Sequence, residues 1–334
     1  MTIKLSIQDA RTLVENAMVA VGHSAVEADI IADHLIDCEL RGVSYGGLPR
    51  ALSIVERIRD TTQPRRPITV LRESPVSASL DGGDQVGYLV ARRATEIAID
   101  KARTSGLALV GASKTWYTGM FSYYLERVTQ AGFAGMLAGS GGQKVAPHGG
   151  TEGRFSTNPI AFGFPSADTP VIWDIGTSNV MLAEVMLAQR LGELLPEGKA
   201  FDKEGKPTRD PNAALQGAFT VWGGHKGSGL AMVVHLLGMM AGQATSPAHL
   251  QDCGFFIIVV NPELLGPADD YKQRVAEYAD QMRATRPVDP AQPVRVPFDR
   301  SVVERVKRIA ANAIEVPDAI HAALREIAAA GTPA

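Results

Sequence analysis

The sequence predicts an α/β protein whose centre alternates strands with helices and whose two chain ends are helical. Near the N-terminus, Ser6 to Asp9 and Ser24 to Glu27 each form a capping box that opens a helix. From about residue 68 to residue 260, short apolar runs typical of strands alternate with longer helical patterns. Helical patterns without strands return after residue 301.

Three helices are expected first, over residues 7–20, 25–40 and 49–59, with Pro49 in the first turn of the third. The connection over residues 41–50 holds three glycines, two arginines, a serine, a tyrosine and a proline, which is more than a simple connection needs. Glycine lets the backbone approach a ligand, and arginine offers a planar fork for a carboxylate. The segment therefore suits a small anionic substrate, with a plain helix–helix turn as the alternative.

The central elements follow in order. Strands are expected at 68–71, 77–80, 107–111, 133–138, 160–164, 171–175 and 255–260, and helices at 86–104, 121–131, 180–191 and 226–240. The helix at 226–240 is apolar on nearly every face, which predicts burial all round. Residues 196–211 are charged and rich in turns, so we expect an exposed excursion there. Helices at 271–285, 301–312 and 317–330 close the chain, after an extended proline-rich connection at 287–297.

Composition narrows the class of protein. The 334 residues are 45% hydrophobic and 21% charged, as in globular proteins, and the formal net charge of −3 favours neither nucleic acid nor an acidic membrane surface. The longest apolar run, residues 229–242, is too short to span a bilayer. The N-terminus lacks the apolar core of a signal peptide, and Cys38 and Cys253 lie inside apolar runs, so we expect a cytoplasmic protein.

The usual nucleotide-binding motifs fail on their context. Gly139-Ser-Gly-Gly142 follows a strand, but Pro147 and the glycines after it rule out the helix that a dinucleotide fingerprint requires. Lys226 resembles a P-loop lysine, yet Gly227 stands where serine or threonine is needed. The histidines show no metal-ligand spacing, so no metal site is expected. Five glycine-rich polar clusters remain and suggest a pocket built from loops: 41–50, 116–120, 146–159, 174–178 and 223–229.

The order of these clusters resembles the malate/L-lactate dehydrogenase family of the second type. Ala146-Pro-His-Gly-Gly150 followed by Ser156-Thr-Asn-Pro159 is similar to the family's P-x-G-G…G-T-N-P. Trp173-Asp-Ile-Gly-Thr-Ser178 is similar to its D-x-A-T-S, and Gly224-His-Lys-Gly-Ser-Gly229 to its G-x-K-G-x-G. Between them, Phe201 to Pro211 is similar to D-x-x-G-x-x-T-x-D-P. The resemblance runs nearly end to end.

The resemblance implies an α/β protein of the α+β type, with a non-Rossmann mixed-sheet core and helical N- and C-terminal segments packed together. It implies a helical domain of residues 1–66 with 287–334, and an NAD(P)-binding domain of residues 67–286. It also implies a homodimer that transfers hydride between NADH or NADPH and a small carboxylate substrate, either a 2-oxo acid or a cyclic imino acid.

The resemblance also implies site residues. Arg50 falls on the arginine that grips the substrate carboxylate, and Thr157 and His148 are expected on the substrate side. The residues expected to bind the cofactor are Tyr117, Thr118, Gly119, Gly176, Thr177, Ser178, His225, Lys226, Asp299 and Arg300.

The chain departs from the family at the proton donor. The family has D-S-H-G-x-x-R, and an ungapped alignment on Arg41 and Arg50 places Gly46 at the histidine. A shift of one residue places Tyr45 there, so Tyr45 is the expected donor, with His148 and His225 as alternatives. Glu184 corresponds to an aspartate found in some members and is expected to be catalytic. A protonated cyclic imine would need less acid help, and a cofactor-binding protein without turnover, with a regulatory or partner-binding role, is the alternative function.

Overall fold

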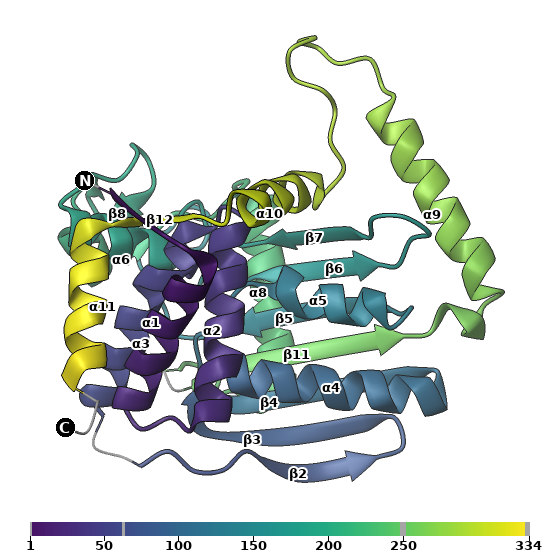
Figure 1. Cartoon of the computed structure of the whole chain (residues 1–334), viewed down its shortest axis with the longest axis horizontal. Helices are drawn as coiled ribbons and strands as arrows, with labels where there is room; N and C mark the ends of the chain where they lie inside the picture. The colour runs from purple at the N-terminus through teal and green to yellow at the C-terminus, as the bar shows by residue number, and fades with distance from the viewer. Residues whose placement is uncertain (1, 62–63, 248–251, 331–334) are drawn as a thin grey trace. The chain divides into compact units, whose positions relative to one another are not determined.

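The computed structural model describes residues 2–61, 64–247 and 252–330 and divides into two compact units (Figure 1). Unit 1 comprises residues 1–65, 182–194 and 301–334, and unit 2 comprises residues 66–181 and 195–300. These bounds differ from the expected domains because residues 182–194 join the helical unit and residues 287–300 join the sheet unit. Each unit is described by itself.

The core of unit 2 is a mixed sheet of seven strands within the described residues, in the order β2-β3-β4-β11-β5-β6-β7. The strands are β2 (Thr69–Ser74), β3 (Ser77–Val86), β4 (Leu107–Trp116), β5 (Ala134–Ser140), β6 (Ile160–Phe164), β7 (Val171–Ile175) and β11 (Cys253–Val260). Of the neighbours described, β3 and β4 run parallel and the other pairs antiparallel. A Rossmann fold needs a mostly parallel sheet, so the expected non-Rossmann mixed sheet is confirmed.

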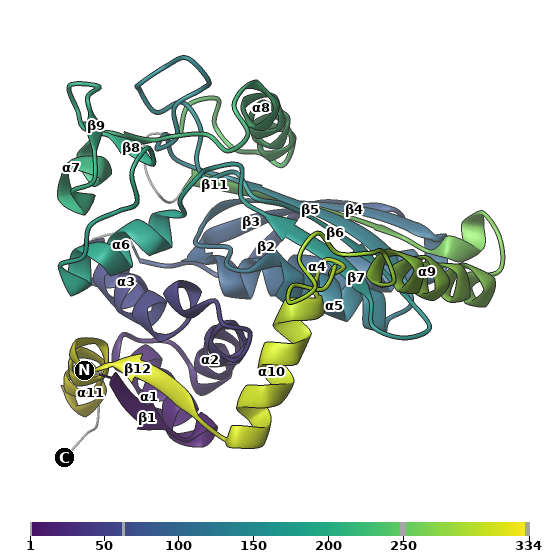
Figure 2. The ribbon, with the colours of Figure 1, turned by 90° about the horizontal axis from the view of Figure 1, so that it is seen from above.

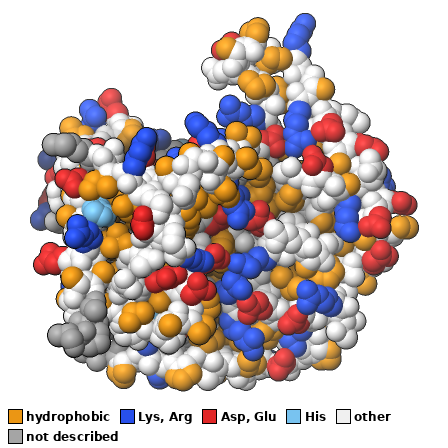
Figure 3. All heavy atoms as spheres, viewed as in Figure 1, with side chains coloured by type: hydrophobic (Ala, Val, Ile, Leu, Met, Phe, Trp, Pro, Cys, Tyr) orange, Lys and Arg blue, Asp and Glu red, His pale blue; other side chains and the backbone are white. Residues whose placement is uncertain are grey.

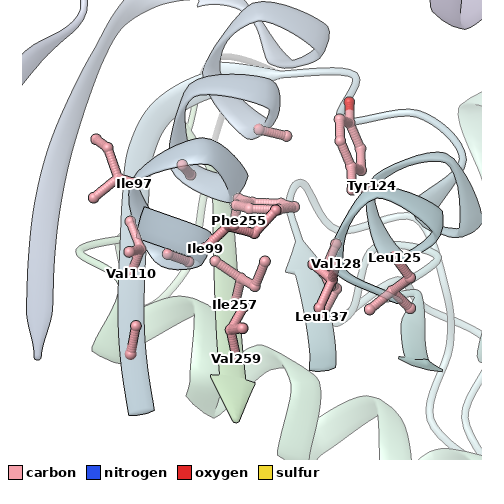
Figure 4. Packing of buried hydrophobic residues seen from close by; sticks show 14 of the residues in the cluster. Ile97, Ile99, Val110, Tyr124, Leu125, Val128, Leu137, Phe255, Ile257 and Val259 are labelled. Carbon is pink, nitrogen blue, oxygen red and sulfur yellow. The ribbon is translucent and has the colours of Figure 1, made fainter. Parts of the chain in front are cut away.

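Helices cover the two faces of this sheet unequally (Figure 2). Helices α4 (Gly87–Ser105) and α5 (Phe121–Gln130) pack on one face, and α8 (His225–Met240) packs on the other. The side chains of β11 alternate between them: Phe255, Ile257 and Val259 join the cluster under α4 and α5 (Figure 4), while Phe256 and Ile258 face α8. Because β11 is apolar on both faces, it reads as one continuous apolar run.

The expectation that the helix at 226–240 is buried all round is wrong. Met232, Val233, Leu236 and Met240 are 56%, 50%, 55% and 63% exposed. One helix lying on one sheet face buries a single stripe of its surface, here including Ala231 and Val234. Apolar composition therefore does not report how many sides of α8 are covered.

The charged segment after residue 195 folds more than expected. Within it, β8 (Ala200–Phe201), β9 (Pro207–Thr208) and β10 (Ala218–Phe219) form a small sheet in the order β10-β8-β9, with α7 (Pro211–Gln216) between β9 and β10. Unit 2 also contains η3 (Pro262–Leu264) and the charged helix α9 (Ala268–Arg283). Basic and acidic side chains intermix over α4 on the face shown in Figure 3.

Unit 1 brings the two chain ends together. Its helices are α1 (Ile7–Ala20), α2 (Ala25–Leu40), η1 (Ser44–Gly46), α3 (Leu48–Arg59), α6 (Leu182–Leu191), α11 (Asp318–Ala330) and most of α10 (Asp299–Ala311). Strand β1 (Thr2–Leu5) pairs antiparallel with β12 (Ile314–Pro317), and α1 packs against α11. The expected packing of N-terminal on C-terminal segments is confirmed.

Helix capping explains why the first boundaries were predictable. The Ser6 hydroxyl accepts from the N–H of Asp9, and Ser24 with Glu27 forms a complete capping box. Each cap satisfies an N–H group that a helix start leaves without a backbone partner, and is worth about 1 kcal/mol. The signal is local, so it can be read from four consecutive residues.

Candidate active site

Within unit 1, the glycine-rich segment forms a short 3-10 helix that leads directly into α3. Tyr45 and Gly46 lie in η1, and Arg50 lies in the first turn of α3, where its N–H donates to the carbonyl of Gly47. Tyr45 and Arg50 are both half-buried. The turn is thus compact and places the phenol and the guanidinium five positions apart on one rigid segment.

Helix α6 lies beside this segment in unit 1. It packs against η1, and Arg50 Nη1 lies 3.8 Å from the sulfur of Met186. The Arg190 guanidinium fixes α6 to α3 with two bonds to Glu56, at 2.8 and 2.6 Å. Glu184 lies on α6, half-buried. The structure therefore places Tyr45, Arg50 and Glu184 on adjoining elements of unit 1.

A buried carboxylate supports the same segment. Glu39 is 1% exposed, and its Oε1 accepts the N–H of Leu48 at 2.8 Å. The Ser44 hydroxyl donates to the same side chain. Burial raises the pKa of Glu39 to about 7, and the hydrogen bonds from Leu48 and Ser44 offset part of that rise. Glu39 was not among the residues that the sequence pointed to.

In unit 2, the start of α8 has the form of an anion site. Gly223 and Gly224 both have positive φ, at 63° and 60°, and the glycine N-cap offers no side chain to the first-turn N–H groups. His225 and Lys226 follow, both exposed. The helix N-terminus and the lysine both favour negative charge at this place.

His148 lies against the same helix start. Its ring centroid is 6.3 Å from that of His225, and the backbone N–H of His148 donates to the Ser228 hydroxyl at 3.2 Å. Two clusters that lie about 75 residues apart in the chain are therefore neighbours in unit 2, as the idea of a pocket built from loops requires.

The turn after β7 is bonded to the turn that carries Thr157. The N–H of Thr177 donates to the carbonyl of Thr157 at 3.0 Å, and its hydroxyl lies 3.1 Å from the carbonyls of Thr157 and Asn158. Thr177 is 0% exposed, so its side chain acts inside the protein. Asn158, at φ 33°, donates to the carbonyl of Ala231 in α8 at 2.8 Å.

The loop between β4 and α5 is also held to the turn after β7. Tyr117 and Gly119 have positive φ, and the carbonyl of Thr118 accepts from the Tyr124 hydroxyl at 2.9 Å. Asp174 accepts the N–H of Ser122 at 2.8 Å. Burial raises the pKa of Asp174 to about 6, against the opposing effect of the bonds from Ser122 and Phe121.

Asp299 and Arg300 are neighbours in the chain but differ in their surroundings. The Asp299 carboxylate accepts from Arg283 at 2.8 and 3.1 Å and from the N–H of Val296 at 2.9 Å. The Arg283 guanidinium therefore lowers the pKa of Asp299. The carboxylate is engaged within unit 2, whereas Arg300 is exposed.

Comparison with known proteins shows the family of the chain. The family described as malate/L-lactate dehydrogenase matches residues 5–325. The chain belongs to the malate/L-lactate dehydrogenase family. The resemblance inferred from the motifs is therefore confirmed, and the protein is an oxidoreductase that uses NAD or NADP.

Relatives of this dehydrogenase cover most of its length. It is 30% identical to a Delta(1)-pyrroline-2-carboxylate reductase of Ancylobacter novellus, over 99% of both chains. It is 29% identical to the ureidoglycolate dehydrogenase (NAD(+)) of Escherichia coli, over 96% of this chain and 94% of that one. A (2R)-3-sulfolactate dehydrogenase (NADP(+)) of Chromohalobacter salexigens is 34% identical over 77% of each. Among solved structures, a dehydrogenase from Sinorhizobium meliloti matches with a TM-score of 0.91, 28% identity and 98% coverage of both chains.

The backbone of unit 2 is open beside the start of α8. Gly149 and Gly229 have no side chain, and a Cβ added at either would meet no atom within 4 Å apart from the neighbouring residues. This open surface and the first-turn N–H groups of α8 suit the phosphates of a dinucleotide. The described residues bring together no group of three or more His, Cys, Asp or Glu that could hold a metal ion. Within the same ranges, no helix has the length and apolar character needed to cross a bilayer.

The sequence does not single out two supporting carboxyl groups. Asp174 stands in the stretch similar to D-x-A-T-S, in which only Gly176, Thr177 and Ser178 were expected to bind the cofactor, and Glu39 lies inside an expected helix. Helices α3 and α5 have N-caps, Gly47 and Met120, that make no side-chain cap bond, and a carboxylate from another element takes that role in each. A helix start without a capping side chain indicates that another residue must accept its N–H groups, but the sequence does not show which residue that is.

Proposed function

We propose that this dehydrogenase reduces the carbonyl of a small 2-oxo acid or the C=N bond of a cyclic imino acid, with the carboxylate of the substrate bound by Arg50. The observation that supports this most directly is the half-buried guanidinium of Arg50, placed in the first turn of α3 with α6 beside it. When bound, NADH or NADPH supplies the hydride. The residues of the chain bind and orient the substrate and supply the proton.

Arg50 has the chemistry for this role because a guanidinium holds a carboxylate with two parallel bonds and so fixes the orientation of the adjacent carbon. Thr157 and His148 are the other proposed substrate contacts. Thr157 is 9% exposed, and its turn is fixed by the bonds from Thr177. A fixed turn keeps a hydroxyl in one position, which favours a single substrate orientation.

The proposed cofactor contacts lie at the start of α8, in the loop after β4 and in the turn after β7. Lys226, His225 and the start of α8 suit the diphosphate. The loop after β4 would contribute Tyr117, Thr118 and Gly119, and the turn bonded to Thr157 would contribute Gly176 to Ser178. Because the side chain of Thr177 is buried, Thr177 would act by holding that turn in place. Asp299 is bonded to Arg283 and would support the cofactor site indirectly. The exposed Arg300 would contact the cofactor itself.

Tyr45 is the proposed proton donor, with Glu184 on adjoining α6 as the second catalytic group. A phenol, with a solution pKa of about 10, is a competent acid toward a nascent alkoxide. A cyclic iminium carries its proton already, so reduction of C=N asks less of Tyr45. This favours a cyclic imino acid over a 2-oxo acid for a chain with Gly46 at the family's histidine position.

Turnover measurements test this function. Purified protein is mixed with NADH or NADPH and with pyruvate, a sulfonated 2-oxo acid or Δ1-pyrroline-2-carboxylate, and absorbance of the reduced nicotinamide is followed. We expect oxidation of one cofactor with at least one substrate. Cofactor binding by fluorescence without turnover on any substrate would instead favour the regulatory, non-catalytic role.

We also propose a homodimer, in which a second copy covers the apolar α8 face of unit 2. Besides the exposed apolar residues of α8, this face carries Trp173, 41% exposed, stacked on Phe162 with ring centroids 6.2 Å apart. Phe164 beside them is 38% exposed. A patch of this kind marks an association surface. In sedimentation, Leu236→Asp should shift the mass from dimer to monomer, while Val288→Asp, at a fully exposed site, should not; a monomeric wild type would refute the proposal.

A cytoplasmic location is proposed from the cysteines. Cys38 is buried and Cys253 half-buried, and both are thiols rather than halves of a disulfide. Thiols persist in reducing compartments. Fractionation of cells that produce the tagged protein tests this, and recovery from an oxidising compartment would contradict it.

A further inference from the structure

We propose that Glu39 is the positioning residue of the substrate side: it holds the segment from Ser44 to Arg50 in the conformation that presents Tyr45 and Arg50. The proposal deepens the function above and rests on it for the roles of those two residues. Its structural part, the restraint of the segment by one buried side chain, stands on the contacts of unit 1 alone.

The contacts of Glu39 bracket Tyr45. Its Oε1 accepts the N–H of Leu48, the first residue of α3, at 2.8 Å, and the Ser44 hydroxyl donates to the same carboxyl group. Ser44 opens η1 and Leu48 opens α3. One side chain therefore fixes the residue before Tyr45 and the helix start that carries Arg50.

Glu39 replaces a missing helix cap. The N-cap of α3 is Gly47, which makes no side-chain cap bond, so the first-turn N–H groups need an acceptor from elsewhere. The glutamate thus defines where α3 begins, and with it the direction in which Arg50 leaves the helix.

Gly47 shows how closely the segment lies on Glu39. A Cβ added to Gly47 would lie 2.2 Å from Oε1 and 2.4 Å from the carboxyl carbon of Glu39. Any larger residue at position 47 would have to displace the carboxyl group or the backbone. Glycine is required here for close approach, since its φ of −92° is open to other residues.

The backbone of Glu39 is itself anchored. Its carbonyl accepts from the Arg308 guanidinium of α10, and Asp37, two residues earlier, contacts Arg305 at 3.1 Å and Arg41 at 2.6 Å. These charged groups surround the end of α2. Glu39 is therefore held by α2 and α10, and its side chain in turn restrains the segment from Ser44 to Arg50.

A purely structural role of Glu39 and a positioning role predict different effects of its replacement. Loss of a structural contact lowers the stability of unit 1 as a whole. Loss of a positioning contact loosens residues 44–50 in the folded protein and weakens substrate binding, while cofactor affinity is unchanged. Glu39→Gln separates the two further, because its amide oxygen can still accept from Leu48 and Ser44.

Hydrogen exchange followed by mass spectrometry tests the restraint on the full chain without any substrate. In Glu39→Ala, we expect amides of the peptide over residues 44–50 to exchange about tenfold faster, as expected for a lost hydrogen bond, with exchange elsewhere in α1 and α11 unchanged. Glu39→Gln should keep near wild-type protection. Leu324→Ala, in the buried core of α11, is the control that lowers stability without loosening this peptide selectively. Wild-type exchange of residues 44–50 in Glu39→Ala would overturn the proposal.

Kinetics test the consequence. Glu39→Ala should raise KM for the substrate found in the turnover assay about tenfold and leave the Kd for NADPH or NADH within twofold, and Glu39→Gln should restore KM. Gly47→Ala should reproduce the effect of Glu39→Ala by displacing the carboxyl group, even if Glu39→Ala does not fold. A loosened segment with wild-type KM would refute positioning. If the wild type turns over no substrate, the proposed function fails, while the exchange result still decides whether Glu39 restrains the segment.

Discussion

The carboxylate of Asp174 accepts the N–H of Ser122 at 2.8 Å, and this bond joins two segments that lie 52 residues apart in the chain. Asp174 is the penultimate residue of β7, just before the turn Gly176 to Ser178, and Ser122 lies in the first turn of α5 just after the loop Tyr117 to Gly119. Both segments are proposed to bind the cofactor. The Asp174 carboxylate therefore joins these two segments within unit 2.

Asp174→Ala should weaken the cofactor site and the fold together. It leaves the N–H of Ser122 without its acceptor, which costs about 1–3 kcal/mol of unfolding free energy. Asp174→Asn keeps an acceptor oxygen and should lose less than half of that. Urea unfolding gives the stability, and nicotinamide fluorescence gives the Kd of NADPH. Equal Kd values for wild type and Asp174→Ala would show that the link does not shape the site.

Arg50→Lys should separate substrate binding from cofactor binding. Lysine keeps the charge but loses the planar fork, so kcat/KM should fall roughly tenfold to hundredfold. The Kd of the cofactor should stay the same. Arg59→Lys, at an exposed position in the last turn of α3, is the matched control and should behave as wild type. If both variants keep full kcat/KM, Arg50 does not hold the carboxylate.

Tyr45→Phe should distinguish the two substrate classes. Removal of a general acid lowers the rate by about 10² or more when a proton must be delivered in the transition state. We expect that loss with a 2-oxo acid and a smaller one with Δ1-pyrroline-2-carboxylate, which is reduced as its iminium. Equal retention of kcat on both substrates would remove Tyr45 as the donor.

Gly46→His tests the missing histidine directly. Gly46 has a φ open to other residues, and an added Cβ would come no closer than 3.5 Å, to the sulfur of Cys38. The variant should therefore fold with a melting temperature near that of wild type. It should also gain rate with a 2-oxo acid relative to a cyclic imino acid. A variant that folds but shows no change in this ratio would place the family's histidine elsewhere in the alignment.

Stability should fall as pH rises from 4.5 to about 7 because of Glu39. Its pKa is raised from 4.5 to about 7 by burial, so the folded state keeps a proton that the unfolded state loses. The stabilising contribution is complete below pH 4.5 and is lost as pH rises to 7, by an amount on the order of 3 kcal/mol. Glu39→Gln removes this titration, so the difference in unfolding free energy between wild type and variant should change over that range. A constant difference from pH 4.5 to 7.5 would contradict the raised pKa.

Lys226→Gln should weaken cofactor binding in a salt-dependent way. The charge at the α8 start attracts a diphosphate, and screening reduces that attraction as ionic strength rises. We expect a Kd several-fold higher at low salt and a smaller difference at 0.5 M salt. Lys203→Gln, on the exposed turn between β8 and β9, provides the control. A salt-independent effect would indicate a packing role for Lys226.

Local signals carried the prediction of the elements. The capping serines Ser6 and Ser24 marked the starts of α1 and α2, and β6 and β7 were found at their observed ends because turns bound them on both sides. The course of the segment after residue 195 was missed, since β8, β9 and β10 have two residues each and stabilise one another only as a sheet. The exposed side of α8 was missed because apolar composition does not say which neighbours a helix has.

The sequence by itself determined most helices and most strands, the order of the glycine-rich motifs and the family that they indicate, because capping, periodicity and short motifs act over a few residues. The tertiary structure alone decided that Glu39 caps α3, that Asp174 holds the start of α5, and that His148 lies beside His225. These contacts join residues from separate elements. Their partners are fixed by how helices and strands pack, and the free energy of that packing is spread over the whole unit rather than over any segment of the chain.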